Sequence, residues 1–317
     1  MAEAGRIDLH AHITPAAYAA EVRRLGAVPD HGLPDWSVQQ TIEMMDAWGT
    51  AMAVLSLTPP GVYFGDQLGA SRLARTVNEA IADVMRDRPD RLGGLAVLPL
   101  PDVGAALDEL AYALDELELD GVELYTNVAG TYLGDPAWDA LFDELDRRQA
   151  FVLVHPAAPP YQSPIAYPNY LVEFPMDTTR AVVSLLYSGT LERCPDIRLL
   201  VSHLGGMVPF LGHRIRSLTL RTDAFDAKVP RGPLAYLADL YYDTGLSANE
   251  AALRATLTLT DVDHVVFGTD WPYAEVAAGS SDPQPGLAAV LDDAGREAVG
   301  RTNAATLLPR LAGAAAV

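Results

Sequence analysis

Two histidines stand two positions apart near the start of the chain. His10 and His12 alternate with apolar residues in Arg-Ile-Asp-Leu-His-Ala-His, a run typical of a β-strand. Side chains two apart in a strand point to the same face, so Asp8 and both imidazoles are expected to face the same interior. Buried imidazoles need partners, and a metal ion is a partner that two adjacent imidazoles can share. The alternative is a pair of hydrogen-bonded core histidines. That alternative does not explain why ligand-type residues recur at the ends of other strands.

Three further residues of this kind stand at or just after apolar runs. His155 ends Phe-Val-Leu-Val-His, His203 ends Leu-Leu-Val-Ser-His, and Asp270 follows Val-Val-Phe-Gly-Thr. A lone carboxylate such as Asp270 is costly to bury unless a cation or hydrogen bonds compensate its charge. Each residue alone is a weak signal, since such residues also form turns. Together they predict nitrogen and oxygen donors gathered at one rim of a sheet.

Short apolar runs alternate with stretches that carry apolar residues at helical spacing, a pattern typical of βα units around a parallel sheet. The expected strands span residues 6–12, 52–57, 92–98, 121–126, 151–155, 198–203, 240–244 and 264–268. Eight strands with intervening helices predict an α/β fold of the (β/α)8 TIM-barrel type, formed by residues 1–317 as one domain. The alternative, a doubly wound open sheet, is disfavoured because no glycine-rich phosphate loop follows the first strand.

Three polar, proline-rich stretches interrupt this alternation at 14–36, 157–175 and 275–285. Each follows an expected strand, on the side where barrel enzymes build their active sites. We therefore expect these stretches to form active-site loops rather than linkers between domains.

The composition narrows the class of partner. The 317 residues include 22 basic and 42 acidic side chains, a formal net charge of −20, which opposes binding to nucleic acid or to an anionic membrane. No apolar run has the length of a membrane span, and the first residues lack the basic and apolar regions of a signal peptide. These features predict a cytoplasmic protein whose partner is a small molecule.

The motifs Asp-Leu-His-Ala-His, Val-His-Pro, Ser-His-Leu-Gly-Gly and Gly-Thr-Asp-Trp-Pro resemble those of the amidohydrolase superfamily. More narrowly, the chain resembles the branch that contains aminocarboxymuconate semialdehyde decarboxylase and the metal-dependent resorcylate and 6-methylsalicylate decarboxylases. The likeness extends over nearly the whole length, and it includes Asp-Thr-Thr-Arg-Ala at 177–181 and Gly-Gly-Met-Val-Pro-Phe after the sixth expected strand.

The resemblance implies one divalent metal ion held by three imidazoles and one carboxylate, those of His10, His12, His155 and Asp270. His203 is then expected close to the metal-bound water or the substrate. Two-metal members of the superfamily use a carboxylated lysine from the fourth strand, and 121–126 contains no lysine. Glu123 is either an alternative bridge or a strand carboxylate with no metal role, and Asp8 either supports the histidines or fills a polar position. Such a donor set suits zinc, and manganese fits if water raises the coordination number.

The same resemblance implies a homodimer. Arg214 stands where the semialdehyde decarboxylase has an arginine that reaches the neighbouring subunit's site. A guanidinium matches a carboxylate as a planar fork, so Arg214 is expected to anchor a substrate carboxylate across the interface. The alternative for this residue is an ordinary surface arginine on a helix.

Several aromatic residues near the expected rim are candidates to wall a flat pocket: Trp36, Phe64, Tyr161, Tyr167, Trp271 and Tyr273. Of these, Trp36 and Trp271 are the expected ring contacts, and Trp271 adjoins Asp270. The remaining histidines, His31, His213 and His264, belong to no such constellation and are interpreted as surface or structural residues.

The function that the resemblance implies is non-oxidative decarboxylation of a small hydroxyaromatic or unsaturated carboxylic acid, salicylate-like in having a hydroxyl beside the carboxylate. The metal would chelate both oxygens, and Asp270 and His203 are the candidate catalytic residues for protonating the ring carbon. The alternative is a metal-dependent hydrolase of a lactone, amide or ester that uses the same mononuclear site. The decarboxylase-like sequence at 209–214 favours the lyase.

Overall fold

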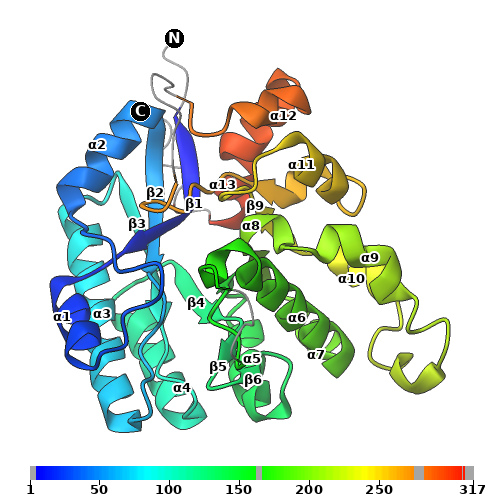
Figure 1. Cartoon of the computed structure of the whole chain (residues 1–317), viewed down its shortest axis with the longest axis horizontal. Coiled ribbons are helices and arrows are strands. Elements are labelled where there is room, and N and C mark those ends of the chain that lie inside the picture. The colour runs from blue at the N-terminus through cyan, green and yellow to red at the C-terminus, as the bar shows by residue number, and fades with distance from the viewer. Residues whose placement is uncertain (1–4, 162–165, 275–281, 309, 311–317) are drawn as a thin grey trace.

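The computed structural model describes residues 5–161, 166–274, 282–308 and 310 (Figure 1). Eight parallel strands pair with one another in their order along the chain. They are β1 (Arg6–Ile13), β2 (Thr50–Leu57), β3 (Leu92–Val97), β4 (Gly121–Tyr125), β7 (Phe151–His155), β8 (Arg198–Val201), β9 (Tyr241–Asp243) and β10 (Val265–Val266). All eight were expected from the sequence, and their ends lie within two residues of the expected ones.

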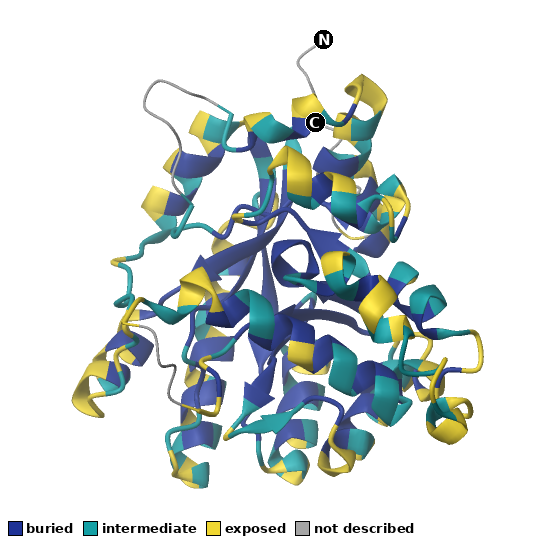
Figure 2. Cartoon of the chain, turned by 45° about the vertical axis from the view of Figure 1, so that its right-hand side comes forward, coloured by how far each residue is buried: buried dark blue, intermediate teal, exposed yellow. Residues whose placement is uncertain are grey.

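Helices follow the strands and form an outer layer. Figure 2 shows the buried strands at the centre and helices whose outward faces are exposed. The helices are α1 (Ala16–Arg24), α2 (Val38–Trp48), α3 (Gln67–Asp87), α4 (Val103–Ala111), α5 (Asp139–Arg147), α6 (Glu173–Ser188), α7 (Thr190–Arg193), α8 (Ser202–Gly205), α9 (Val208–Arg216), α10 (Pro233–Ala238), α11 (Glu250–Thr256), α12 (Asp293–Glu297) and α13 (Asn303–Leu307). A short antiparallel hairpin, β5 (Asn127–Val128) and β6 (Thr131–Tyr132), follows β4.

Helix α3 shows how the sequence builds this layer. The Asp66 side chain accepts a hydrogen bond from the backbone N–H of Leu68 and caps the first turn. Ala70, Ala74, Val77 and other buried residues then recur at helical spacing along one face. That face packs on β3, so the helix is fixed to the sheet by its apolar stripe.

The sheet closes between its last strand and β1. The backbone N–H of Leu9 donates to the carbonyl of Phe267, at 3.0 Å. The N–H of Asp270 donates to the carbonyl of His10, and the N–H of His12 donates to the carbonyl of Trp271, each at 2.7 Å. These bonds complete a (β/α)8 barrel, as expected, and they bring Asp270 beside the two histidines of β1.

A β-bulge corrects the expected alternation in β1. The register of β1 against β2 shifts in the segment after Asp8. Before the shift, Ile7 packs in the interior cluster with apolar residues of β2, β3 and β7, so Asp8 points away from it, whereas after the shift His12 lies opposite Ser56 of β2. The prediction that Asp8 shares the face of the two histidines is therefore wrong, because the bulge adds one residue to the strand.

The barrel interior is apolar in its lower part, toward the amino ends of the strands, and polar in its upper part, toward their carboxyl ends. The strand residues of the lower part are Ile7, Leu9, Met52, Val54, Leu95, Phe151, Leu153, Leu200 and Val266. Nearer the carboxyl ends of the strands, buried polar side chains replace them, among them both histidines of β1 and His155. The fold thus presents its buried polar groups at the rim where barrel enzymes hold their active sites.

The loops after β1 and β7 meet above this rim. The backbone N–H of Asn169 donates to Asp30 Oδ2 at 2.9 Å, across 139 positions of sequence. Of the third stretch expected to form an active-site loop, residues 275–281 lie outside the described residues. None of the described helices combines the length and apolar character needed to cross a membrane.

Candidate active site

Four side chains that could hold a metal ion converge at the carboxyl ends of β1, β7 and β10. One ligand atom from each lies within 4.8 Å of the others, in the group His10, His12, His155 and Asp270. The Nε2 atoms of His10 and His12 are 3.3 Å apart. Asp270 Oδ1 lies 2.9 Å from His12 Nε2 and 3.3 Å from His10 Nε2. The structure therefore brings together the four residues expected to bind the metal.

The hydrogen bonds around this group indicate that a cation belongs between the four atoms. His155 Nδ1 lies 2.9 Å from the carbonyl of Pro156, an acceptor, so Nδ1 carries the hydrogen. His155 Nε2 then carries a lone pair, and this nitrogen is buried with no hydrogen-bond partner among the described residues. His10 Nδ1 likewise faces a carboxylate, which turns the lone pair of its Nε2 inward. Lone pairs and a carboxylate oxygen that face one another are satisfied by a divalent ion.

Asp243, at the end of β9, supports the site and was missed in the sequence. Its Oδ2 lies 2.9 Å from His10 Nδ1, and both side chains are fully buried. Its Oδ1 accepts the backbone N–H of His203 at 3.0 Å and that of Gly245 at 2.8 Å. Asp243 thus fixes a metal ligand and the backbone of a candidate catalytic residue. Its position at the end of an expected strand, 240–244, was the available signal.

Asp8 supports the site through the backbone rather than through an imidazole. Its carboxylate accepts the backbone N–H of His10 at 3.0 Å, and the N–H and hydroxyl of Thr269 at 3.0 and 2.6 Å. Burial raises the pKa of Asp8 to about 7, although these donors lower it. Asp8 therefore joins β1 to the residue that precedes Asp270.

Burial and charge set the protonation of the ligands in the absence of a metal. Burial alone would lower the pKa of His10, but the carboxylates of Asp243 and Asp270 raise it well above its ordinary value. Burial lowers the pKa of His155 well below its ordinary value. Burial would raise the pKa of Asp270, and the charge of His10 instead holds it well below its usual range. Metals bind deprotonated ligands, so an entering ion displaces the proton of His10.

His203 lies beside the metal ligands but outside the group of four. Its Nε2 is 3.1 Å from Asp270 Oδ2, and 8% of the residue is exposed. Strand β8 ends at Val201, two residues before the expected end, and His203 adopts a left-handed conformation with φ of 57°. This turn aims the imidazole at Asp270, where the pair can exchange a proton.

Glu123 lies inside the barrel, in the middle of β4. Both of its carboxylate oxygens are buried, and burial raises its pKa to about 8, although the neighbouring Ser56 and Tyr125 lower it. Glu123 is absent from the group of four donor atoms, so the geometry gives no support to a bridging role.

The residues expected to bind substrate lie in different surroundings. Arg214 is exposed on α9 and forms no ion pair with any residue that the structure describes. The Trp271 ring packs edge-on against Trp48, with centroids 5.6 Å apart, and Trp36 packs partly buried against the main core. Both expected indoles carry a buried Nε1 without a partner in the described part of the chain. Their contact with substrate stays a prediction.

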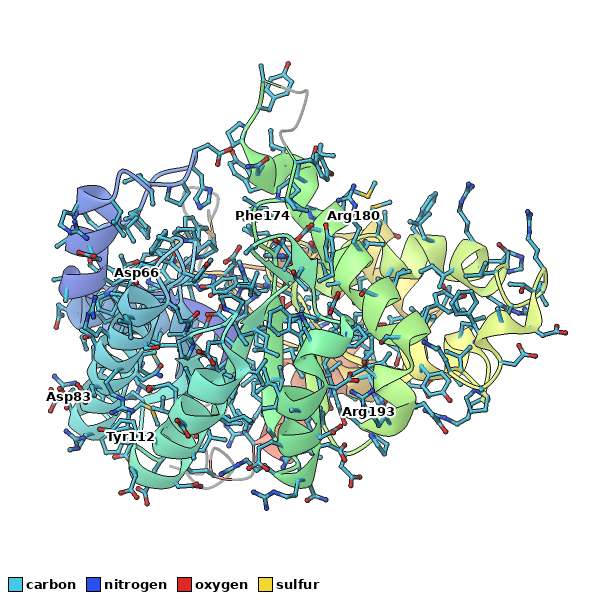
Figure 3. All side chains as sticks on the ribbon, turned by 90° about the horizontal axis from the view of Figure 1, so that it is seen from below. Asp66, Asp83, Tyr112, Phe174, Arg180 and Arg193 are labelled. Atoms are coloured by element: carbon cyan, nitrogen blue, oxygen red, sulfur yellow. The ribbon has the colours of Figure 1, made fainter. Side chains whose placement is uncertain are left out.

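Three other aromatic rings pack edge-on against the metal ligands, and one of them, Tyr125, lies 6.2 Å from His155 between ring centroids. Tyr273 lies 5.9 Å from His12 between ring centroids, and its hydroxyl is 2.6 Å from Thr58 Oγ1. Phe174, labelled on α6 in Figure 3, lies 6.5 Å from His155. Tyr273 was one of the aromatic residues expected near the rim, whereas Phe174 carried no distinguishing signal in the sequence.

Known proteins resemble this chain over most of its length. Residues 7–310 match the family model described as amidohydrolase. The chain is 37% identical over 293 residues to the decarboxylase yanB of Aspergillus niger, covering 86% of this chain and 78% of that protein. It is 34% identical over 319 residues to the 6-methylsalicylic acid decarboxylase acuB of Aspergillus aculeatus, covering 96% of each.

Solved structures share the fold. One described as amidohydrolase II superimposes with a TM-score of 0.86 at 28% identity, covering 96% of this chain and 99% of the other. The 5-carboxyvanillate decarboxylase of Novosphingobium aromaticivorans, complexed with manganese and 4-hydroxy-3-methoxy-5-nitrobenzoic acid, superimposes with a TM-score of 0.81 at 21% identity and covers 96% of each chain. The matched motifs, the barrel and the extent of the sequence match together place this chain in the amidohydrolase family.

Proposed function

We propose that this protein is a metal-dependent, non-oxidative decarboxylase of a small hydroxyaromatic carboxylic acid, salicylate-like in having a hydroxyl beside the carboxylate. The observation that carries the proposal is the convergence of three imidazoles and Asp270 on one point, with His203 beside them. The relatives support the choice of reaction, since the 6-methylsalicylic acid decarboxylase matches this chain over 96% of its length.

The donor set supports a single divalent ion. Three nitrogens and one carboxylate oxygen suit zinc, and we propose zinc as the resident metal. Manganese is the alternative, and a structural neighbour was solved with it. When bound, the ion supplies a positive charge that attracts the carboxylate and hydroxyl oxygens of the substrate and stabilises the charge that develops on the ring.

Protonation of the ring carbon falls to Asp270 and His203. The hydrogen bond between His203 Nε2 and Asp270 Oδ2 lets one residue replace the proton that the other delivers. The ring carbon gains this proton, the carbon–carbon bond to the carboxylate breaks, its electrons stay on the ring, and CO2 leaves. Both residues are buried, so bulk water is largely kept from the reacting carbon.

Arg214 completes the proposal. Its exposed position on α9, without an ion pair among the described residues, leaves the guanidinium able to bind a carboxylate. We propose that it does so across a homodimer interface, in the site of the neighbouring subunit, and that residues 1–317 act as one catalytic domain.

A substrate panel tests the reaction. Metal-loaded protein is incubated with salicylate-type acids and with lactones, while evolved CO2 and ring absorbance are recorded. We expect CO2 in proportion to the acid consumed, and its release at least about 100-fold slower from a His203→Ala control. A lactone opened by the protein, with no CO2 from any acid, would show a hydrolase instead.

A further inference from the structure

A turn at residues 29–32 brings two polar residues to the tip of the loop after β1. The backbone N–H of Gly32 donates to the carbonyl of Pro29 at 2.9 Å, and Gly32 has a φ of 82°, a conformation that glycine adopts freely. Asp30 and His31 therefore occupy the two central positions of the turn. The bond from Asn169 to Asp30 holds this tip against the segment that precedes α6.

His31 is enclosed by aromatic rings, although it was interpreted from the sequence as a surface or structural residue. Only 9% of its side chain is exposed. Its ring centroid lies 6.4 Å from Tyr170, 5.9 Å from Phe174 and 5.5 Å from Tyr273, all in edge-on arrangements. The turn, α6 and the segment after β10 therefore meet at this imidazole.

Two of these rings also contact the metal ligands. Tyr273 contacts both His31 and His12, and Phe174 contacts both His31 and His155. Figure 3 labels Phe174 on α6, the helix that follows the β7 loop. His31 thus stands one aromatic ring away from two of the four metal ligands, on the side where the strands end.

The hydrogen bonds of His31 leave one nitrogen available. Its Nδ1 lies 3.2 Å from Asp30 Oδ1, and a carboxylate partner favours the tautomer with the hydrogen on Nδ1. Nε2 then carries a lone pair, and no described residue donates to it. A nitrogen acceptor without a protein partner, on a side chain that is 9% exposed, is suited to a donor on a ligand.

We propose that His31 determines substrate specificity by accepting, through Nε2, a hydrogen bond from a hydroxyl on the substrate ring at a position remote from the carboxylate. This inference rests on the proposed function, since the metal ligands fix the carboxylate end of the acid. Tyr170, Phe174 and Tyr273 then pack against the apolar part of the ring. The preferred substrates are salicylates that carry a second, distal hydroxyl.

Matched substrates and variants test this role. The substrates are pairs of salicylates that carry either a hydroxyl or a methoxy group at the same ring position. Only the hydroxyl can donate a hydrogen bond to His31, because a methoxy group has no hydrogen to donate. The variants are His31→Phe, which keeps a ring and loses the nitrogen, and His31→Gln, whose side chain offers an oxygen acceptor of similar reach. His264→Phe is the control, because His264 stacks on Tyr241, away from the metal ligands.

We expect wild-type protein to prefer one hydroxylated acid over its methoxylated partner by roughly tenfold in kcat/KM, the effect of one hydrogen bond. His31→Phe should abolish most of this preference through KM, with kcat and metal content unchanged, while His31→Gln should restore part of it. A preference that survives in His31→Phe, or that falls equally in His264→Phe, overturns the inference.

Binding measurements separate this inference from the proposed reaction. Calorimetric titration of the metal-loaded protein with the same acids reports the preference without turnover. If wild-type protein binds the hydroxylated acid more tightly but releases no CO2, the proposed reaction fails and His31 keeps its role. If CO2 is released from every acid with equal affinity, the reaction holds and the role of His31 is wrong.

Discussion

Asp243 Oδ2 lies 2.9 Å from His10 Nδ1, in a part of the barrel where neither side chain is exposed. Two strands that are far apart in sequence, β9 and β1, are joined by this contact. The carboxylate fixes the imidazole so that Nε2 faces the other ligands, and it makes that nitrogen a better donor to a metal.

Replacing this carboxylate tests its role. Asp243→Asn should weaken metal affinity roughly 10- to 100-fold, because the amide binds Nδ1–H less strongly and orients the ring less well. Competition with a chromogenic chelator measures the affinity. Asp239→Asn is the matched control, since Asp239 is a surface residue paired with Arg231. Equal affinities for both variants would contradict the assignment.

Variants of the site should separate metal binding from catalysis. His155→Ala and Asp270→Asn each remove a donor atom and should lose most of the bound metal. His203→Ala should keep the metal and lose about 100- to 10,000-fold in turnover, since His203 hydrogen-bonds Asp270 but is not a ligand. Elemental analysis beside CO2 release measures both. Full metal content in the two ligand variants would rule out this donor set.

The buried Glu123 predicts a dependence of stability on pH. Burial raises its pKa to about 8, so the folded chain keeps a proton that the unfolded chain releases at lower pH. From the ordinary carboxyl pKa up to about 8, the free energy of unfolding therefore falls as pH rises. A glutamine does not ionise, so Glu123→Gln removes this fall in the free energy of unfolding. The gain in Tm of the metal-free variant over the metal-free wild type should be several degrees larger at about pH 9 than at about pH 5.

Thermal unfolding of the wild-type protein and of Glu123→Gln, measured from about pH 5 to about pH 9, checks the direction of this pH dependence. A gain in Tm that is the same at both pH values would indicate that Glu123 is ionised in the folded chain or has a partner there.

Hybrid dimers test the position of Arg214. Arg214→Ala and His203→Ala proteins are each expected to have little activity, but a mixed dimer contains one site with both residues intact. Random exchange of subunits should restore about a quarter of the wild-type activity. Arg216→Ala, an exposed arginine on the same helix, should keep its activity and serves as the control. No recovery after exchange would place Arg214 outside the neighbouring site.

The apolar runs of the sequence predicted the strands, and the resemblance to the amidohydrolase superfamily predicted which four of the ligand-type residues bind the metal. Imidazoles and a carboxylate at the ends of apolar runs are costly to bury alone, so they point to a shared ligand. Parallel strands end on the same rim, which let residues as distant as His12 and Asp270 be grouped without knowledge of the fold.

What the sequence did not predict depends on contacts between distant segments. The bulge in β1 follows from its pairing with β2, and it moves Asp8 off the histidine face. The His31 side chain is only 9% exposed because its turn is bonded to Asn169, 139 positions from Asp30. Neither pairing leaves a local pattern, since a turn with Asp and His is equally common on an open surface.

Removal of the metal tests the central claim, that His10, His12, His155 and Asp270 hold a divalent ion on which the reaction depends. Purified protein is analysed for metal, treated with a strong chelator, assayed for CO2 release from its best acid, and assayed again after zinc or manganese is added. We predict one metal ion per chain, loss of activity with the metal, and recovery on its return. Undiminished CO2 release from the metal-free chain would contradict the account.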